Sequence, residues 1–216
     1  MSIRIADSEP IAVRVSVEAN QKTWHLPKKL LTTKSTFFAT ALYGGFAEQD
    51  SKTVTLPEVR SEGFEKLVRW LYLGEMHFER NKELELHEYK ELVHLWNLGD
   101  MLGCPMFQDA IMNLLLFRLS EDDTLIYGMS PEVLAFIWDA CVPCSKLRKF
   151  AIDQCIVDVR MGRFTSESMQ VYIQFAEDNE DFARAYAAAS IRNGKLKREY
   201  LWDDRTDYFS SPQSNT

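Results

Sequence analysis

Apolar and polar residues alternate near the start of the chain, which is the pattern of half-buried β-strands. Valines occupy every second position of residues 13–17, with polar residues between them. This period of two predicts a strand. Residues 20–22 (Asn-Gln-Lys) form the expected turn, and residues 23–26 return as a second strand. Ile3 and Ile5 show the same alternation and mark a further candidate strand.

After the second strand the apolar positions recur every three or four residues, which favours helices. Pro27 suits the first turn of a short helix through Leu31, because the N–H that proline lacks would be unbonded there. Ser35 is expected to cap a second helix, which the glycine pair 44–45 ends. Residues 53–56 (Thr-Val-Thr-Leu) have the composition of a short strand.

Three longer helices follow. Apolar residues at i, i+3, i+4 and i+7 over residues 64–71 predict an amphipathic helix that stops near Gly74. A second helix is expected over residues 87–102, with a break at residues 103–105 (Gly-Cys-Pro). The third, over residues 106–119, is apolar on two opposite sides and must therefore be buried on both. We expect it to carry the core of the first domain into the region that follows.

The second half of the sequence has a helical pattern throughout. A Ser-Pro-Glu start predicts a helix over residues 130–141, and further helices are expected over residues 145–159 and 166–191. The last of these is predicted to break near Asn179. Residues 202–216 are mostly polar, and we expect them to be a disordered tail.

The order of these elements carries a family resemblance. Strand, strand, helix, helix, strand and helix over residues 13–74 resemble the core of the BTB/POZ domain. Residues 95–111 (L-W-N-L-G-D-M-L-G-C-P-M-F-Q-D-A-I) resemble the later helical hairpin of that domain. Residues 145–153 (S-K-L-R-K-F-A-I-D) resemble the helix that follows it in small stand-alone BTB proteins of filamentous fungi. The chain departs from the family pattern at Pro27, where histidine is frequent, and at Gly99, where alanine is frequent.

The resemblance implies an α+β protein in three parts. Residues 11–119 would form a BTB/POZ fold, in which a small mixed sheet is flanked by helical hairpins. Residues 120–201 would form an all-helical C-terminal extension, and residues 202–216 the tail.

The resemblance also implies a function in protein–protein interaction, as a self-associating adaptor or scaffold. Members of the family form homodimers through their first helices and N-terminal strand. In this chain that implies a dimer interface with Leu30 and Leu31 on the first helix and with Ile3 and Ile5 as anchors for strand exchange.

Some members of the family bind a cullin scaffold and so act as adaptors for ubiquitin ligation. They carry a hydrophobic-x-Glu triplet after the second helix, and Phe46-Ala47-Glu48 matches it. The resemblance thus implies partner-binding roles for Phe46 and Glu48. A second hypothesis with the same fold is a nuclear, transcription-associated regulator that acts by recruiting partners through a groove of the dimer.

Composition narrows the classes of partner. The 216 residues are 46% hydrophobic and 26% charged, as in ordinary globular proteins. A net charge of −7 disfavours direct nucleic-acid binding, which needs basic residues against phosphate. No run of 18 apolar residues suggests a membrane span, and no stretch near Met1 resembles a signal peptide. We therefore expect an intracellular protein, cytoplasmic or nuclear, with reduced thiols.

The residue types that usually carry catalysis or bind metals are present without the spacing that such chemistry needs. Cys141 and Cys144 form a C-x-x-C pair, but zinc needs four ligands and no second pair accompanies them. His87 and His94 are seven residues apart, whereas a chelating pair on a helix needs a spacing of four. We expect no enzyme activity, no metal and no cofactor.

Overall fold

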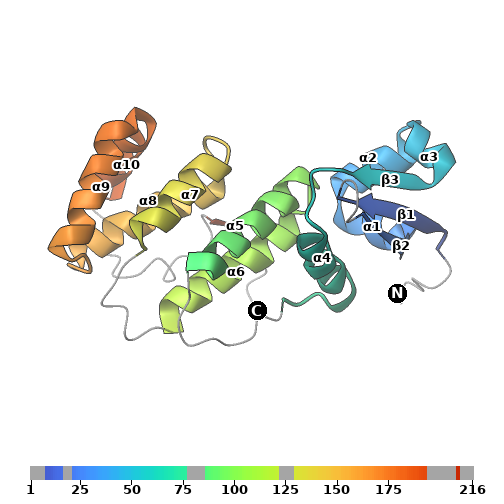
Figure 1. The fold of residues 1–216 in the computed structure, drawn as a ribbon, viewed down its shortest axis with the longest axis horizontal. Coiled ribbons are helices and arrows are strands. Elements are labelled where there is room, and N and C mark those ends of the chain that lie inside the picture. Colours follow the sequence, from blue (N-terminus) through green and yellow to red (C-terminus); the bar gives the residue numbers. More distant parts are fainter. Residues whose placement is uncertain (1–7, 17–20, 77–85, 122–128, 194–207, 210–216) are drawn as a thin grey trace. The chain divides into compact units, whose positions relative to one another are not determined.

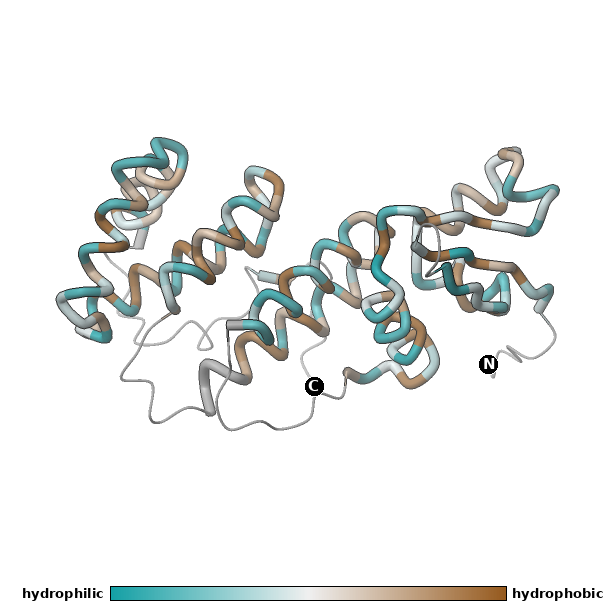
Figure 2. Tube along the Cα trace, in the orientation of Figure 1, coloured by the Kyte–Doolittle hydropathy of each residue, from teal (hydrophilic) through white to brown (hydrophobic). Residues whose placement is uncertain are grey.

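The computed structural model describes residues 8–16, 21–76, 86–121, 129–193 and 208–209 of the chain. They belong to two compact units. The first unit comprises residues 1–80 and 94–111, and the second comprises residues 81–93 and 112–216. Along the helices and strands of each unit, hydrophobic and hydrophilic positions alternate in short bands (Figure 2). Such bands are what elements with one buried and one solvated face produce.

The first unit contains a three-stranded mixed sheet. Strand β1 (Pro10–Val15) lies between β2 (Lys22–Pro27) and β3 (Thr53–Leu56) (Figure 1). β1 runs antiparallel to β2 and parallel to β3. The first strand begins earlier than the valine pattern predicts and ends before residue 17, because Ser16 adopts a φ of 71° and turns the chain. Val17 itself lies outside the described residues, as do Ile3 and Ile5.

The first unit also contains four complete helices and parts of two others. The four are α1 (Lys28–Lys34), α2 (Thr36–Tyr43), α3 (Ala47–Ser51) and α4 (Ser61–Leu73). The others are α5 (Leu86–Met101) and α6 (Pro105–Glu121), each of which contributes residues to both units. Buried side chains from β1 and from the helices make up the core, among them Val13, Val15, Leu31, Leu42, Phe64 and Leu67.

Pro27 differs slightly from its predicted place. It was expected in the first turn of the first helix, but it is the last residue of β2 and caps α1 from outside. Its φ of −59° suits both positions, since the proline ring fixes that angle near −65°.

Ser35 joins α1 to α2 and fixes both to the turn between α5 and α6. Its hydroxyl accepts a hydrogen bond from the Phe38 N–H at 3.1 Å, which is the predicted cap of α2. The same hydroxyl donates to the Leu102 carbonyl at 2.5 Å. Ser35 is 3% exposed, so one buried side chain satisfies two backbone groups.

The second unit is helical among its described residues. It contains α7 (Pro131–Ala140), α8 (Lys146–Arg160), α9 (Ser166–Asp178) and α10 (Glu180–Asn193). Ser130 caps α7 as predicted, and the predicted break falls at Asn179 between α9 and α10. Ser145, expected as the first residue of its helix, is instead the residue that caps α8.

The helix predicted over residues 106–119 is α6, and it is buried on more than one side. Phe107 and Ile111 belong to the first unit, whereas Met112, Leu115 and Leu116 belong to the second, and all five are buried. The chain therefore forms an α+β domain followed by a helical region, as its sequence predicts.

Two residues depart from the expectation of a disordered tail. Tyr208 and Phe209 are 1% and 4% exposed. They contact α8 inside the second unit. The remainder of residues 202–216 lies outside the described residues.

Candidate protein-binding surface

The predicted partner-binding residues lie where α2 turns into α3, a segment we call the α2–α3 corner (residues 43–51). Helix α2 ends when the Gly44 N–H bonds to the Thr40 carbonyl at 2.8 Å. Gly45 then adopts a φ of 77°, which glycine accommodates at little cost. Phe46 is extended and caps α3. The chain thus reverses direction within three residues and leaves the phenylalanine on the outside.

Phe46 is ordered by local contacts although it is exposed. A Cβ atom placed on Gly44 would lie 2.9 Å from Cε2 of Phe46, so the ring rests directly on the glycine. The Gln49 side chain accepts a hydrogen bond from the Gly45 N–H at 3.1 Å and fixes the turn. Even so, Phe46 is 53% exposed. A large apolar ring held in place and facing solvent is suited to contact another protein.

Glu48 and Tyr43 extend the same corner. Glu48 lies in the first turn of α3, where a carboxylate is favoured by the helix dipole, and it is partly exposed. Tyr43 is 62% exposed, and the Lys28 Nζ lies 4.3 Å from the centre of its ring. Tyr43 is not among the predicted site residues. The available signal was its position outside the stripe formed by Phe38 and Leu42, the buried residues of α2.

The structure places Leu30 and Leu31, predicted at a dimer interface, in the core of the first unit. Leu30 is 5% and Leu31 is 0% exposed. The outward positions of α1 are instead polar, with Lys29 and Thr33 exposed. From sequence alone the two leucines fit a core or an interface equally well, because both environments select apolar residues. Of the predicted site residues, the structure brings Phe46 and Glu48 together on one exposed corner.

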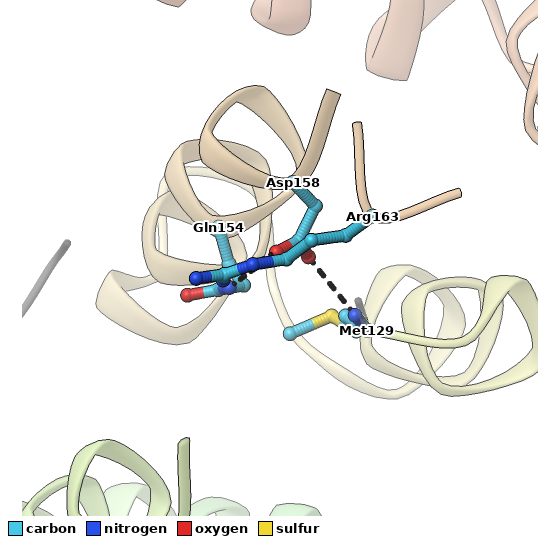
Figure 3. A network of polar contacts seen from close by, with 4 residues as sticks. All are labelled: Met129, Gln154, Asp158 and Arg163. Atoms are coloured by element: carbon cyan, nitrogen blue, oxygen red, sulfur yellow. Dashed lines mark hydrogen bonds and ion pairs between the residues drawn. The ribbon is translucent and has the colours of Figure 1, made fainter. Parts of the chain in front are cut away.

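Buried ionisable groups were examined as candidates for chemistry. Asp158 is 0% exposed and lies at the centre of a polar network in the second unit (Figure 3). Its carboxylate accepts hydrogen bonds from the Met129 N–H at 2.9 Å, from Gln154 at 2.8 Å and from Arg163 at 3.1 Å. Burial raises the pKa of Asp158, and these three donors oppose that shift. The arrangement joins the start of α7 to the end of α8, which is a structural role.

The four cysteines are thiols, and none of them is in a disulfide. Cys141 is buried while Cys144 is exposed, and the two do not form a disulfide. Burial raises the pKa of Cys104 to about 11 and that of Cys155 to about 12. Within the described part of the chain, no three His, Cys, Asp or Glu residues are grouped so that they would hold a metal ion. A search of the same residues for membrane-spanning helices found none of sufficient length and apolarity.

Comparison with known proteins adds to this geometry. Residues 9–118, about half of the chain, match the model of the BTB/POZ domain family. The chain is also 29% identical over 110 residues to a BTB/POZ domain-containing protein of Arabidopsis thaliana. That similarity covers 51% of this chain but 13% of the plant protein, so it concerns one domain of a much longer relative.

Proposed function

The chain belongs to the BTB/POZ domain family, whose domains generally mediate protein–protein interaction, and we propose that it is a self-associating adaptor or scaffold. One observation supports a specific partner surface. The α2–α3 corner presents an aromatic ring, Phe46, that is fixed by its neighbours and still 53% exposed. Burying an ordered ring stabilises a complex without a large loss of side-chain entropy.

We propose that the α2–α3 corner binds a cullin scaffold and that the protein serves as a ubiquitin-ligase adaptor. In this proposal Phe46 is the apolar anchor, Tyr43 widens the apolar contact and Glu48 supplies a charge at the rim. Such a combination is typical of interfaces, in which a few aromatic side chains carry most of the binding energy and polar groups surround them.

The test compares the binding of a purified cullin to the wild-type chain and to the Phe46→Ala/Glu48→Ala variant, by isothermal titration. Because truncation of a central aromatic typically costs about 2 kcal/mol or more, we expect affinity to fall at least ~30-fold. Both side chains are outside the core, so the variant should fold, with a loss of about 1–2 kcal/mol at most from the helix-dipole interaction of Glu48 and the local packing of Phe46.

A matched control is available in the same unit. Tyr72 is 54% exposed and Glu75 is also exposed, at the end of α4. The Tyr72→Ala/Glu75→Ala variant removes an equally exposed aromatic and an acid from another place. It should bind the cullin like the wild type. Equal losses in both variants, or binding that neither change affects, would contradict a cullin site at the α2–α3 corner.

Self-association is proposed to use the edges of the sheet. β1 is the central strand, so the outer edges of β2 and β3 have no pairing partner among the described strands. Unpaired edges accept additional strands. We propose that the segment with Ile3 and Ile5 adds to such an edge in a second copy, which would explain why alternating residues precede β1.

Light scattering at micromolar concentration tests this proposal. The wild type should have twice the 25.1 kDa mass of one chain. Ile3→Asp/Ile5→Asp should shift it toward the monomer, because a charge in a paired strand loses its hydration. The control is Ile191→Asp, which changes an isoleucine that is 81% exposed. A wild-type mass of 25.1 kDa alone would exclude the dimer.

A further inference from the structure

A short C-terminal segment is bound to α8. Tyr208 is 1% and Phe209 is 4% exposed, although the sequence around them is polar. Aromatic residues in a polar segment can be buried only against another part of the protein, because their sequence neighbours are too polar to form an apolar core around them. In this structure that part is one face of α8.

That face consists of four residues, Lys146, Lys149, Phe150 and Asp153, which we call the α8 face. Their spacing of i, i+3, i+4 and i+7 places them on one side of a helix. All four lie in the segment 145–153, which resembles the helix after the BTB domain in other proteins. The proposed function assigns no role to this segment.

Each residue of the α8 face makes a contact with the bound dipeptide. The Tyr208 hydroxyl donates to Oδ2 of Asp153 at 2.9 Å. The ring of Phe150 meets the Tyr208 ring edge to face, with centroids 5.7 Å apart, and the Lys149 Nζ lies 4.6 Å from the centre of the same ring. The Lys146 Nζ donates to the Phe209 carbonyl.

These contacts are selective for a tyrosine. Asp153 is 6% exposed, and its carboxylate also pairs with Lys149 at 2.8 Å. A phenylalanine at position 208 would leave this carboxylate without the phenol donor. A hydrogen bond to a charged group contributes about 1.5–3 kcal/mol, which corresponds to about tenfold or more in affinity. The face thus recognises a phenol through its hydroxyl as well as its ring.

We propose that the α8 face is a binding site for a Tyr-Phe pair and that the chain's own Tyr208 and Phe209 occupy it in cis as a detachable strap. The occupant is seated in the structure and belongs to the same chain as its site. A ligand that is covalently linked to its site binds intramolecularly, so its docking does not depend on protein concentration. While the strap is docked, the α8 face is covered, and its release exposes a site for an equivalent aromatic segment.

The first experiment uses the full chain with Tyr208→Ala/Phe209→Ala, which empties the α8 face. A fluorescently labelled peptide with the sequence of residues 203–214 is titrated into this variant and into the wild type, and anisotropy is measured. We expect binding to the variant and at least tenfold weaker binding to the wild type, where the tethered strap competes. A peptide with phenylalanine in place of Tyr208 should bind the variant about tenfold more weakly.

A second change locates the peptide on the α8 face. Asp153→Ala in the emptied variant should abolish the preference for tyrosine over phenylalanine in the peptide. The proposal is overturned if a folded emptied variant binds no peptide, or if binding is the same with and without the phenol hydroxyl.

A second measurement keeps the proposal testable if the emptied variant does not fold. Chymotrypsin is added to the wild-type chain, and cleavage after Tyr208 and Phe209 is followed by mass spectrometry. Cleavage there should be slow in the wild type and at least tenfold faster in Asp153→Ala. A strap docked in cis gives rates that do not depend on protein concentration. Equally fast cleavage in both proteins, or protection that grows with concentration, would overturn docking in cis.

Discussion

Ser35→Ala is the substitution whose cost the structure specifies best. The change removes the cap of α2, which costs about 1 kcal/mol. It also removes the 2.5 Å hydrogen bond to the Leu102 carbonyl, whose residue is 0% exposed. The Leu102 oxygen keeps a longer hydrogen bond from the Phe37 N–H, with an N···O distance of 3.4 Å, so it is not left wholly unpaired. The lost hydrogen bond therefore adds about 1–2 kcal/mol to the destabilisation. The expected destabilisation is therefore about 2–3 kcal/mol.

Urea unfolding followed by tryptophan fluorescence measures this cost, and a thermal scan should show a fall in Tm of about 5–10 °C. The neighbouring Thr36 supplies the control, because its exposed hydroxyl makes only a 3.4 Å contact with the Gly103 carbonyl. Thr36→Ala should change the free energy of unfolding by less than about 0.5 kcal/mol. If Ser35→Ala costs no more than Thr36→Ala, the double role of Ser35 is refuted.

Three further predictions concern other parts of the chain. Gly103→Ala should cost more than Gly74→Ala in urea unfolding. Both glycines have positive φ, but only at position 103 would a Cβ collide with the Thr36 hydroxyl, at 2.0 Å. Adding Thr36→Ala should recover part of the difference, because the Cβ of residue 36 stays 3.3 Å away. Asp158→Ala should destabilise by about 3–5 kcal/mol because it removes a fully buried carboxylate that accepts hydrogen bonds from the Met129 N–H, Gln154 and Arg163. Glu180→Ala, at an exposed ion pair, should cost less than about 1 kcal/mol, and comparable values would contradict the buried network. At pH 8 a thiol reagent should label Cys144 rapidly and Cys104 and Cys155 slowly, since burial raises the pKa of these two to about 11 and about 12; a fast phase that persists in Cys144→Ser would refute this.

Local signals in the sequence predict much of the fold. Ser35 and Ser130 cap their helices as predicted, because a serine hydroxyl at a helix start accepts a hydrogen bond from an otherwise unpaired backbone N–H. Residues 53–56 form the predicted strand. The parallel pairing of β1 with β3 could not be predicted from the sequence of either strand. The register and direction of the pairing depend on how the helices between the two strands position the second one.

The exposure of Phe46 could be predicted from local geometry, whereas that of Leu30 and Leu31 could not. Phe46 comes after two glycines that end α2, and residues in such turns are more often exposed than residues on the apolar face of a helix. Leu30 and Leu31 sit within a helix, and their exposure depends on what packs against it. A helical pattern identifies an apolar face but does not say whether the same chain or a second copy covers it. Leu30 and Leu31 are buried within one copy of the chain, and their place at a dimer interface stays a prediction.

The burial of Tyr208 and Phe209 could not be predicted from the sequence, for a different reason. Two adjacent aromatic residues in a polar segment have no period, and periodicity is the main signal from which burial is inferred in a sequence. Composition then favours disorder, because a short polar segment cannot bury enough apolar surface to offset its loss of entropy. Tyr208 and Phe209 are nevertheless buried, because α8 provides the surface against which they pack. The Asp153 carboxylate of α8 accepts a hydrogen bond from the Tyr208 hydroxyl, which would otherwise be buried unpaired. A docked segment of this kind can be found only by asking which helix face, elsewhere in the chain, has polar groups that remain to be satisfied.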